Sequence, residues 1–434
     1  MHIPYTKHVL GNGLPVLIHE DHRCPIAAVN LWYHVGSKNE QPGRTGFAHL
    51  FEHLMFEGSE HYDHGYFQPL QQAGGVLNGS TNADRTNYWE VVPTNSLELA
   101  LWMESDRMGH LLPALTETKF ANQREVVLNE RRQNYENRPY GMAAMATVGA
   151  LFPPDHPYHW LTIGSAEDLR AASLEDVRAF FQRFYHPGNA SLAVAGDVDP
   201  DRVLALIESY FGGIPAGPEV RDVTASASLC EEVRLVLEDA VELPRLYLSW
   251  LSPPIFQPGD AELDLVADLL AEGKSSRLYK TLVYDGRQAT DVTAVQQSRE
   301  LAGFFQLIAT AAPGHCLAEL DDAITCEINR VAAEGPSPSE LERSLAQAEA
   351  HFVYRLQTVG GFGGKSDQLN QYNVFVGDPG FSGRDLDRYR QASAASVKGT
   401  AASVLAGASR VAVSVVPRGR LDLALPDSTK VVCS

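Results

Sequence analysis

Two histidines and a glutamate in the segment GFAHLFEHLMFEG, residues 46–58, have the types and spacing of a metal site. His49 and His53 are four residues apart, so on a helix their imidazole rings lie one above the other on the same face. Both rings can then reach one zinc ion about 2.0–2.1 Å from each ligating nitrogen. Glu52 projects on the same side and can polarise a metal-bound water without binding the ion. The pattern H-x-x-E-H therefore predicts a hydrolytic zinc site.

A helix must hold these three side chains. Apolar residues in the same segment recur at i, i+3, i+4, i+7 and i+8, which is the stripe of a helix packed against a core. The alternative is an ordinary solvated helix face that carries two histidines by chance, and a third ligand would decide between the two. The residues of the apolar stripe are Phe47, Leu50, Phe51, Leu54 and Met55.

A catalytic zinc usually takes three protein ligands and keeps one position for water. The candidate third ligand is Glu130, in the helical stretch KFANQREVVLNERRQNYENRP, where it shares a face with Gln123 and Val127. Glu125 lies in the same stretch. Residue types and periodicity do not separate the two glutamates.

The elements around this segment alternate between strands and helices. HVLGNGLPVLIHEDH, residues 8–22, predicts two short strands around an Asn-Gly turn. Pro218 and small polar residues predict a linker at 216–232. The other predicted strands are 25–37 and 191–198, and the predicted helices are 46–57, 63–73, 94–109, 116–136 and 200–215.

The second half of the chain resembles the first. The segment that begins at Arg170 matches the one that begins at Arg390, and Gly58 matches Gly273, at offsets of 220 and 215 residues. We therefore expect an α+β protein of two homologous units, each a mixed β-sheet packed with α-helices. The expected boundaries are 1–215 for the zinc-binding half, 216–232 for the linker and 233–434 for a second half that lacks the metal motif.

Composition excludes several classes of function. The formal net charge of −19 opposes binding to nucleic acid or to an anionic membrane surface. No apolar run approaches the roughly 18 residues of a membrane span, and the N-terminal residues lack the shape of a signal peptide. An odd number of widely spaced cysteines predicts neither a disulfide framework nor a cysteine zinc site. These are Cys24, Cys230, Cys316, Cys326 and Cys433.

The whole chain resembles the pitrilysin family of zinc peptidases, the inverzincins, in the half-length branch that includes the subunits of mitochondrial processing peptidase. In this family H-x-x-E-H is followed by 76 residues and a glutamate ligand, and counting from His53 gives Glu130. Gly36, Gly46 and the phrase EVVLNERRQ also match. The resemblance implies one Zn²⁺ per chain, bound by His49, His53 and Glu130, with Glu52 as general base of a metalloendopeptidase.

The resemblance also implies a substrate-binding edge strand in GGVLNGSTNADRTNYWEVV, residues 74–92. Such an edge binds an extended peptide as an added strand, through its main chain. The alternative is an ordinary hairpin without a binding role. The residues that match the family's edge are Asn78, Gly79, Ser80 and Thr81.

The second half departs from the family pattern. Family members that act alone place an Arg and, seven residues later, a Tyr in the active site, where they bind substrate and stabilise the oxyanion. In SSRLYKTLVYDGRQATDV, Val283 and Thr290 stand at those positions, and neither can do this work. Replacement by a neighbour would require a shift of the chain. The neighbours are Arg277, Tyr279, Tyr284 and Arg287.

The missing pair implies a partner, since losing an oxyanion donor costs about a hundredfold or more in rate. We expect a heterodimer in which a homologous subunit supplies the Arg and the Tyr, and a chain that is weak or inactive alone. The competing hypothesis is a structural core-type subunit of a larger assembly. Paired members of the bacterial branch that this chain resembles are often exported, which predicts the periplasm, with the cytoplasm as the alternative.

Two further features are expected to have no role in catalysis. The glycine-rich stretch 359–366 lacks the spacing of a phosphate-binding loop and follows a predicted helix, so we interpret it as a loop that ends that helix. Four histidines in predicted loops are expected not to bind the catalytic metal. They are His61, His64, His156 and His159.

Overall fold

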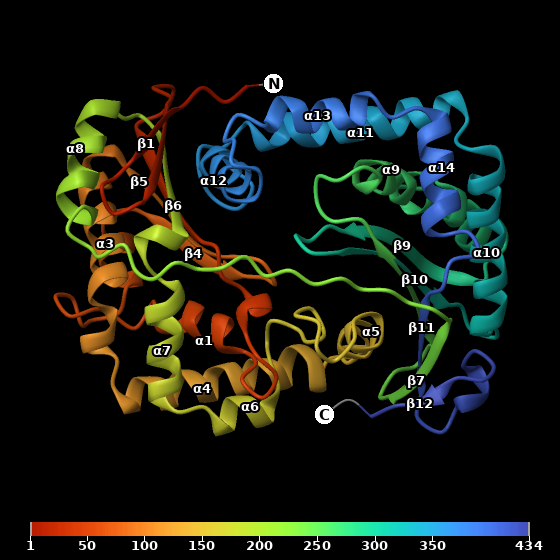
Figure 1. Cartoon of the computed structure of the whole chain (residues 1–434). Helices are drawn as coiled ribbons and strands as arrows, with labels where there is room; N and C mark the ends of the chain where they lie inside the picture. Colours follow the sequence, from red (N-terminus) through yellow and green to blue (C-terminus); the bar gives the residue numbers. More distant parts are fainter. Residues whose placement is uncertain (1, 433–434) are drawn as a thin grey trace. The chain divides into compact units, whose positions relative to one another are not determined.

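The computed structural model describes residues 2–432, and its first unit is built on a six-stranded mixed sheet (Figure 1). Neighbouring strands are antiparallel except β2 and β6, which are parallel. The strands lie in the order β1-β2-β6-β3-β5-β4, so β4 forms one edge. Their bounds are β1 (Thr6–Val9), β2 (Pro15–Glu20), β3 (Ile26–Tyr33), β4 (Val76–Thr81), β5 (Thr86–Pro93) and β6 (Ala190–Gly196).

The first unit comprises residues 2–129, 162–223 and 351–384. The predicted helix–strand pattern of residues 8–215 is confirmed, with ends shifted by a few residues. Residues 216–230 contain neither helix nor strand, as the linker prediction requires. The helices are α1 (Phe47–Leu54), α2 (Phe67–Gln72), α3 (Leu97–Ala114), α4 (Glu117–Arg131), α6 (Ala166–Ala171), α7 (Leu174–Phe184), α8 (Pro200–Phe211) and α12 (Lys365–Val376).

The second unit comprises residues 130–161, 224–350 and 385–432 and has its own six-stranded mixed sheet. Its order is β12-β7-β11-β8-β10-β9, with strands β7 (Val233–Asp239), β8 (Arg245–Ser252), β9 (Ala289–Gln297), β10 (Gly303–Ala311), β11 (Val411–Pro417) and β12 (Thr429–Lys430). The helices are α5 (Ala143–Leu151), α9 (Asp260–Ala271), α10 (Leu317–Glu334), α11 (Pro338–Arg355), α13 (Ser382–Arg390) and α14 (Ala394–Val404).

The two sheets share one topology, which confirms the predicted fold class. Strands β2, β6, β3, β5 and β4 have the same spatial order as β7, β11, β8, β10 and β9. Helices α7 and α14 start 220 residues apart, the offset seen in the sequence, and each begins with a serine capping box, at Ser173 and Ser393. This correspondence supports a duplication.

Each unit contains a segment from the other half of the chain. Helix α5, from the first half, packs against β7, β8 and β11 of the second sheet. Helix α12, from the second half, lies beside β2, β3 and β6 of the first sheet, where Figure 1 shows it in blue. The contiguous halves predicted at 1–215 and 233–434 do not contain this exchange.

Asp367 fixes α12 to the first sheet. One of its carboxylate oxygens accepts hydrogen bonds from Trp32 Nε1 at 2.8 Å and Asn87 Nδ2 at 3.0 Å. The other accepts from the backbone N–H of Gly363 at 2.7 Å, at the end of the glycine-rich loop. Asp367 is buried, so these donors have no access to bulk water. The predicted helix-ending loop thus also starts the next helix.

A buried arginine holds the opposite face of the first sheet. Arg107, on α3, donates to Glu104 and lies 3.4 Å from Glu90 on β5. Its guanidinium lies over the rings of Tyr66 and Tyr88, 3.9 and 4.2 Å from their centroids. Burial acts to lower the pKa of Arg107, but the carboxylates outweigh it and raise the pKa, so the arginine stays charged.

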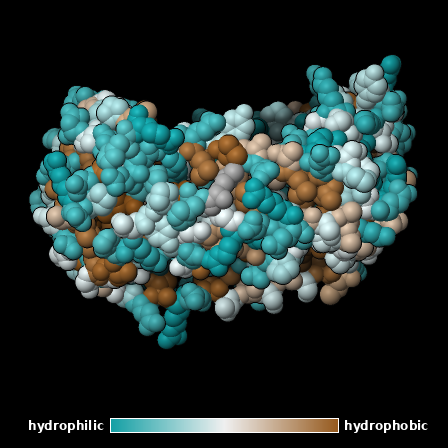
Figure 2. Space-filling model, turned by 90° about the horizontal axis from the view of Figure 1, so that it is seen from above, coloured by the Kyte–Doolittle hydropathy of each residue, from teal (hydrophilic) through white to brown (hydrophobic). Residues whose placement is uncertain are grey.

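Hydrophilic residues cover most of the face seen in Figure 2, in keeping with the net charge of −19. None of the helices among residues 2–432 is both long and apolar enough to span a bilayer. The described cysteines, Cys24, Cys230, Cys316 and Cys326, are free thiols, and Cys433 lies outside the described residues.

Replacing Asp367 by Ala should lower the free energy of unfolding of the first unit by about 3 kcal/mol, because buried donors on Trp32 and Asn87 lose their acceptor. Urea denaturation followed by tryptophan fluorescence measures this change. Asp222→Ala, in the exposed linker, is the matched control and should shift stability by less than about 0.5 kcal/mol. Equal stability of the two variants would contradict the anchoring role of Asp367.

Candidate metal centre

Helix α1 is fixed by burial of one face. The predicted apolar stripe is confirmed, because Phe47, Leu50, Phe51, Leu54 and Met55 are 0–3% exposed. Phe51 packs against the rings of Phe181 and Tyr185. His49, Glu52 and His53 are half-buried and project from the remaining face. The orientation of α1 thus follows from the aromatic core beneath it.

The start of α1 depends on a carboxylate six residues upstream. The N-cap residue is Gly46, whose φ of 90° suits glycine and which has no side chain to cap the helix. Buried Glu40 accepts instead from the backbone N–H groups of Gly46 and Ala48, both at 2.9 Å. A carboxylate here satisfies two of the helix's unpaired donors and complements its positive end.

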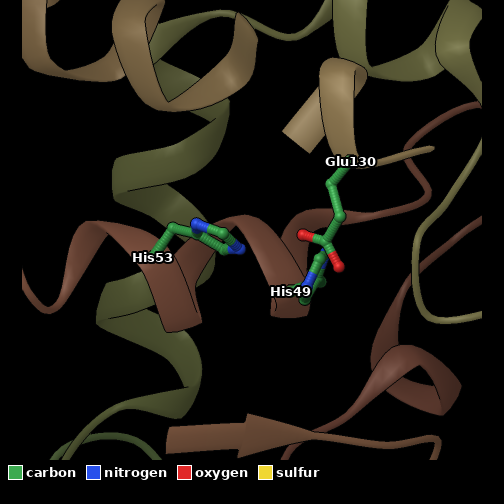
Figure 3. Close-up of side chains that lie close together, drawn as sticks. All are labelled: His49, His53 and Glu130. Carbon is green, nitrogen blue, oxygen red and sulfur yellow. The ribbon is translucent and has the colours of Figure 1, made fainter. Parts of the chain in front are cut away.

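The structure brings His49, His53 and Glu130 together. One potential ligand atom from each lies within 4.8 Å of the others, and all three residues are half-buried. The two imidazole rings are 4.9 Å apart between centroids and nearly perpendicular, at 88°. Figure 3 shows the histidines on α1 and the glutamate facing them from α4. Two imidazole nitrogens and one carboxylate oxygen form a donor set suited to a catalytic zinc.

Glu130, and not Glu125, is the carboxylate beside the histidines. Glu130 lies in the last turn of α4, one residue beyond the boundary at which the two units divide, and the continuous helix carries it to the site. Its carboxylate accepts from Asn134 Nδ2 at 3.3 Å. Glu125 is exposed. Gln123 donates to Glu57, just after α1, at 2.5 Å and so links α4 to the segment that follows the histidines.

Arg85, which the sequence analysis did not single out, places a cation near Glu52. Burial lowers the pKa of its guanidinium, against the opposing charges of Asp367 and Glu52. Its Nη1 donates to the backbone carbonyl and the hydroxyl of Ser80 on β4, at 2.8 and 2.6 Å. Its position in the turn between β4 and β5 was the available signal, but nothing local linked that turn to Glu52.

The predicted substrate residues, 78–81, lie on β4, at the edge of the sheet beside α1. β4 pairs with β5 as an antiparallel hairpin. Gly79 packs so closely that an added Cβ would lie 3.1–3.2 Å from the rings of Tyr88 and Phe56. The edge position agrees with both the binding-strand and the ordinary-hairpin interpretations.

In the second unit, the positions expected to carry Arg and Tyr have structural roles. Val283 packs against the hydrophobic core, and the hydroxyl of exposed Thr290 lies 3.0 Å from Asp291. Arg277 is held by Glu340 through two hydrogen bonds of 2.9 and 2.8 Å. Of the other neighbours, Tyr279 packs against the same core, and Tyr284 and Arg287 are exposed.

The remaining histidines lie outside the cluster of His49, His53 and Glu130. His156 is buried and its Nδ1 accepts from the backbone N–H of Tyr158, whereas His159 contacts the carbonyl of Phe152 at 2.7 Å. Burial lowers the pKa of His156. Both lie in the predicted loop between α5 and α6. His61 and His64 lie in the loop that follows α1.

Comparison with known protein families gives two matches in succession. Residues 15–147 match the model described as insulinase, peptidase family M16, and residues 171–348 match the M16 peptidase inactive domain. The zinc protease PqqE of Helicobacter pylori is 29% identical over 372 residues, 84% of this chain and 83% of that protein. An uncharacterized zinc protease of Mycobacterium leprae is 28% identical over 343 residues, 76% and 74% of the two chains.

Solved structures agree. A protease from Helicobacter pylori superposes with a TM-score of 0.88 at 26% identity, covering 95% of this chain and 100% of the other. A peptidase M16 inactive domain from Pseudomonas fluorescens has the same fold, with a TM-score of 0.84 at 17% identity and coverage of 95% and 98%. The resemblance found in the sequence is thereby confirmed, and the chain belongs to the M16 family of peptidases, as a half-length, pitrilysin-type member.

Proposed function

We propose that this chain is the zinc-binding catalytic subunit of a metalloendopeptidase that cleaves peptides or unfolded segments. The observation that carries the proposal is the convergence of His49, His53 and Glu130 within 4.8 Å, with Glu52 on the same helix face as the histidines. The names of the relatives, zinc proteases, agree with it. The competing role as a structural core subunit has no need of such a donor set.

In this proposal His49, His53 and Glu130 hold one zinc ion, which when bound polarises the scissile carbonyl and acidifies a water. Three ligands leave a position for water and substrate. The chain's own residues do the rest of the work. Glu52 accepts the proton of the attacking water and passes it to the leaving amine, a role that contributes about 10²–10⁴-fold in rate.

Strand β4 supplies the alignment of the peptide. As the edge strand it has main-chain groups available to pair with an extended segment, and residues 78–81 lie nearest its β5 end. Arg85 bonds to the Ser80 carbonyl and so stiffens the end of this strand. Because main-chain pairing reads shape more than side chains, the edge favours unfolded substrates of varied sequence.

The partner is the second element of the proposal. Val283 and Thr290 cannot donate to a developing oxyanion, and Arg277, the nearest arginine before them, is bound to Glu340. We propose a homologous subunit that carries the Arg and Tyr and forms a heterodimer with this chain. For the compartment we propose the periplasm, which a fold relative, the periplasmic protease PqqL from Escherichia coli, supports by analogy.

Replacing Glu52 by Gln should leave zinc content unchanged and reduce peptide cleavage by about 10³-fold, because the amide cannot accept the proton. Zinc measured by mass spectrometry and turnover of a quenched fluorescent peptide, both in the presence of the partner, check this. Retained turnover at normal zinc content would rule out Glu52 as the base.

Replacing Glu130 by Gln should weaken zinc binding by about tenfold or more, because a neutral amide is a poor zinc ligand. Glu125→Gln is the matched control on the same helix, since Glu125 is exposed. Competition with a chromophoric chelator measures both dissociation constants. If the two variants lost zinc equally, or neither did, the ligand assignment would fail.

The isolated chain should cleave peptides at least about a hundredfold more slowly than the chain mixed with its homologous partner. The decisive control is a partner in which the Arg and Tyr are replaced by Val and Thr, the residues found here. That partner should bind but not activate. Full activity of the isolated chain would refute the two-subunit site.

A further inference from the structure

The described residues contain a second group of potential metal ligands, away from the residues assigned to catalysis. Glu60 and His61 lie in the loop after α1, and His110 lies on α3. One donor atom from each lies within 4.8 Å of the others. Two imidazoles and a carboxylate match the donor types of the first cluster, although the residues are more exposed.

The backbone places these residues together without help from an ion. The N–H of Glu60 donates to the carbonyl of His110 at 3.0 Å. His110 has non-helical angles, φ −133° and ψ 23°, so α3 kinks there. Pro113 explains the kink, because it has no N–H to donate to the carbonyl of Gly109. The kink therefore gives His110 a carbonyl that can bind the loop.

A buried carboxylate orients His61. Its Nδ1 lies 2.6 Å from Asp106 Oδ1, and the second oxygen of Asp106 accepts from the hydroxyl of Ser59. The Asp106 side chain is only 4% exposed, whereas that of His61 is 54% exposed. With Nδ1 held by the carboxylate, Nε2 is the nitrogen available to a ligand. Carboxylate–histidine–metal arrangements use this geometry to fix ring and tautomer.

Glu60 and His110 complete the group. His110 Nδ1 lies 3.1 Å from Glu60 Oε2, and the rings of His61 and His110 are 4.6 Å apart between centroids. An ordinary surface ion pair would account for the Glu60–His110 contact, but such pairs are weak. It would not account for the orientation of the adjacent His61 by a buried Asp106.

We propose that Glu60, His61 and His110 form a second site, for a divalent transition metal of the zinc type. Imidazole with carboxylate favours Zn²⁺, Co²⁺, Ni²⁺ or Cu²⁺ over Ca²⁺ or Mg²⁺, which prefer oxygen ligands. Ligand atoms around a tetrahedral zinc lie about 3.3 Å apart, so small rotations of these exposed side chains close the site. Water completes the coordination from the open side.

The role of this ion is to stabilise the loop that follows α1. It would join residues 60 and 61 to α3 through side chains in addition to the backbone bond. Asp63 of the same loop is paired with Lys119 on α4, the helix that carries Glu130. A metal bound here would thus stiffen a loop that lies between the two helices of the first cluster in the chain's contacts, without touching substrate.

The test compares Zn²⁺ bound per chain after equilibrium dialysis, measured by mass spectrometry. The variant Glu60→Gln/His110→Gln keeps the His61–Asp106 pair and should bind one ion fewer than the unchanged chain. His64→Gln, a histidine in the same loop, is the matched control and should lose none. Equal zinc content in the double variant and the unchanged chain would overturn the proposal.

The His49→Ala/His53→Ala variant separates this site from the proposed catalytic one. That variant should still bind one Zn²⁺, and Zn²⁺ should raise its thermal unfolding midpoint. Adding His61→Ala to it should abolish both effects, and their persistence would overturn the proposal. If the catalytic cluster did not bind zinc, the unchanged chain would bind one ion and Glu60→Gln/His110→Gln none, so the two failures are distinguishable.

Discussion

Burial of one face of α1 is the constraint on which the rest of the site depends. A helix of eight residues cannot be stable alone, so its position must come from packing. Phe51 lies on Phe181 and Tyr185, and Leu50 and Leu54 are fully buried. Because side chains on a helix have fixed angular spacing, this packing leaves His49 and His53 a single direction. Metal geometry is therefore set by the aromatic core, not by the ligands themselves.

The first sheet depends equally on a segment from the far end of the chain. A sheet buried on both faces needs a layer on each side, and α12 provides one of them through Asp367 and its buried donors. The other side holds Arg107 between tyrosine rings. The zinc-binding half is thus incomplete as a contiguous stretch, and we expect residues 2–223 expressed alone to leave one face of β3 and β6 uncovered.

The sequence predicted what depends on local order and missed what depends on long-range contact. The helix at 46–57, the hairpins and the linker follow from periodicity and turn chemistry, which act over a few residues. The choice of Glu130 over Glu125 rested on a family spacing, because a helix face alone does not say what lies opposite it. The exchange of α5 and α12 left no local signal. Neither did the pairing of Glu60 with His110, which needs a kink in α3.

The second unit explains why duplication did not yield two metal sites. Helices α1 and α9 both start one residue after a glycine with positive φ, Gly46 and Gly259. Aligned on those glycines, His49, Glu52 and His53 correspond to Glu262, Leu265 and Val266. Leu265 and Val266 are 1% and 0% exposed. The face that could have bound metal is packed into the second core, and Glu262 caps its own helix by accepting from Gly259 at 3.1 Å. Regaining a ligand there would bury an unpaired polar group, so the cost of refilling the core keeps this unit without metal chemistry. The same packing leaves catalysis to one helix per chain, and any further catalytic group must come from another subunit.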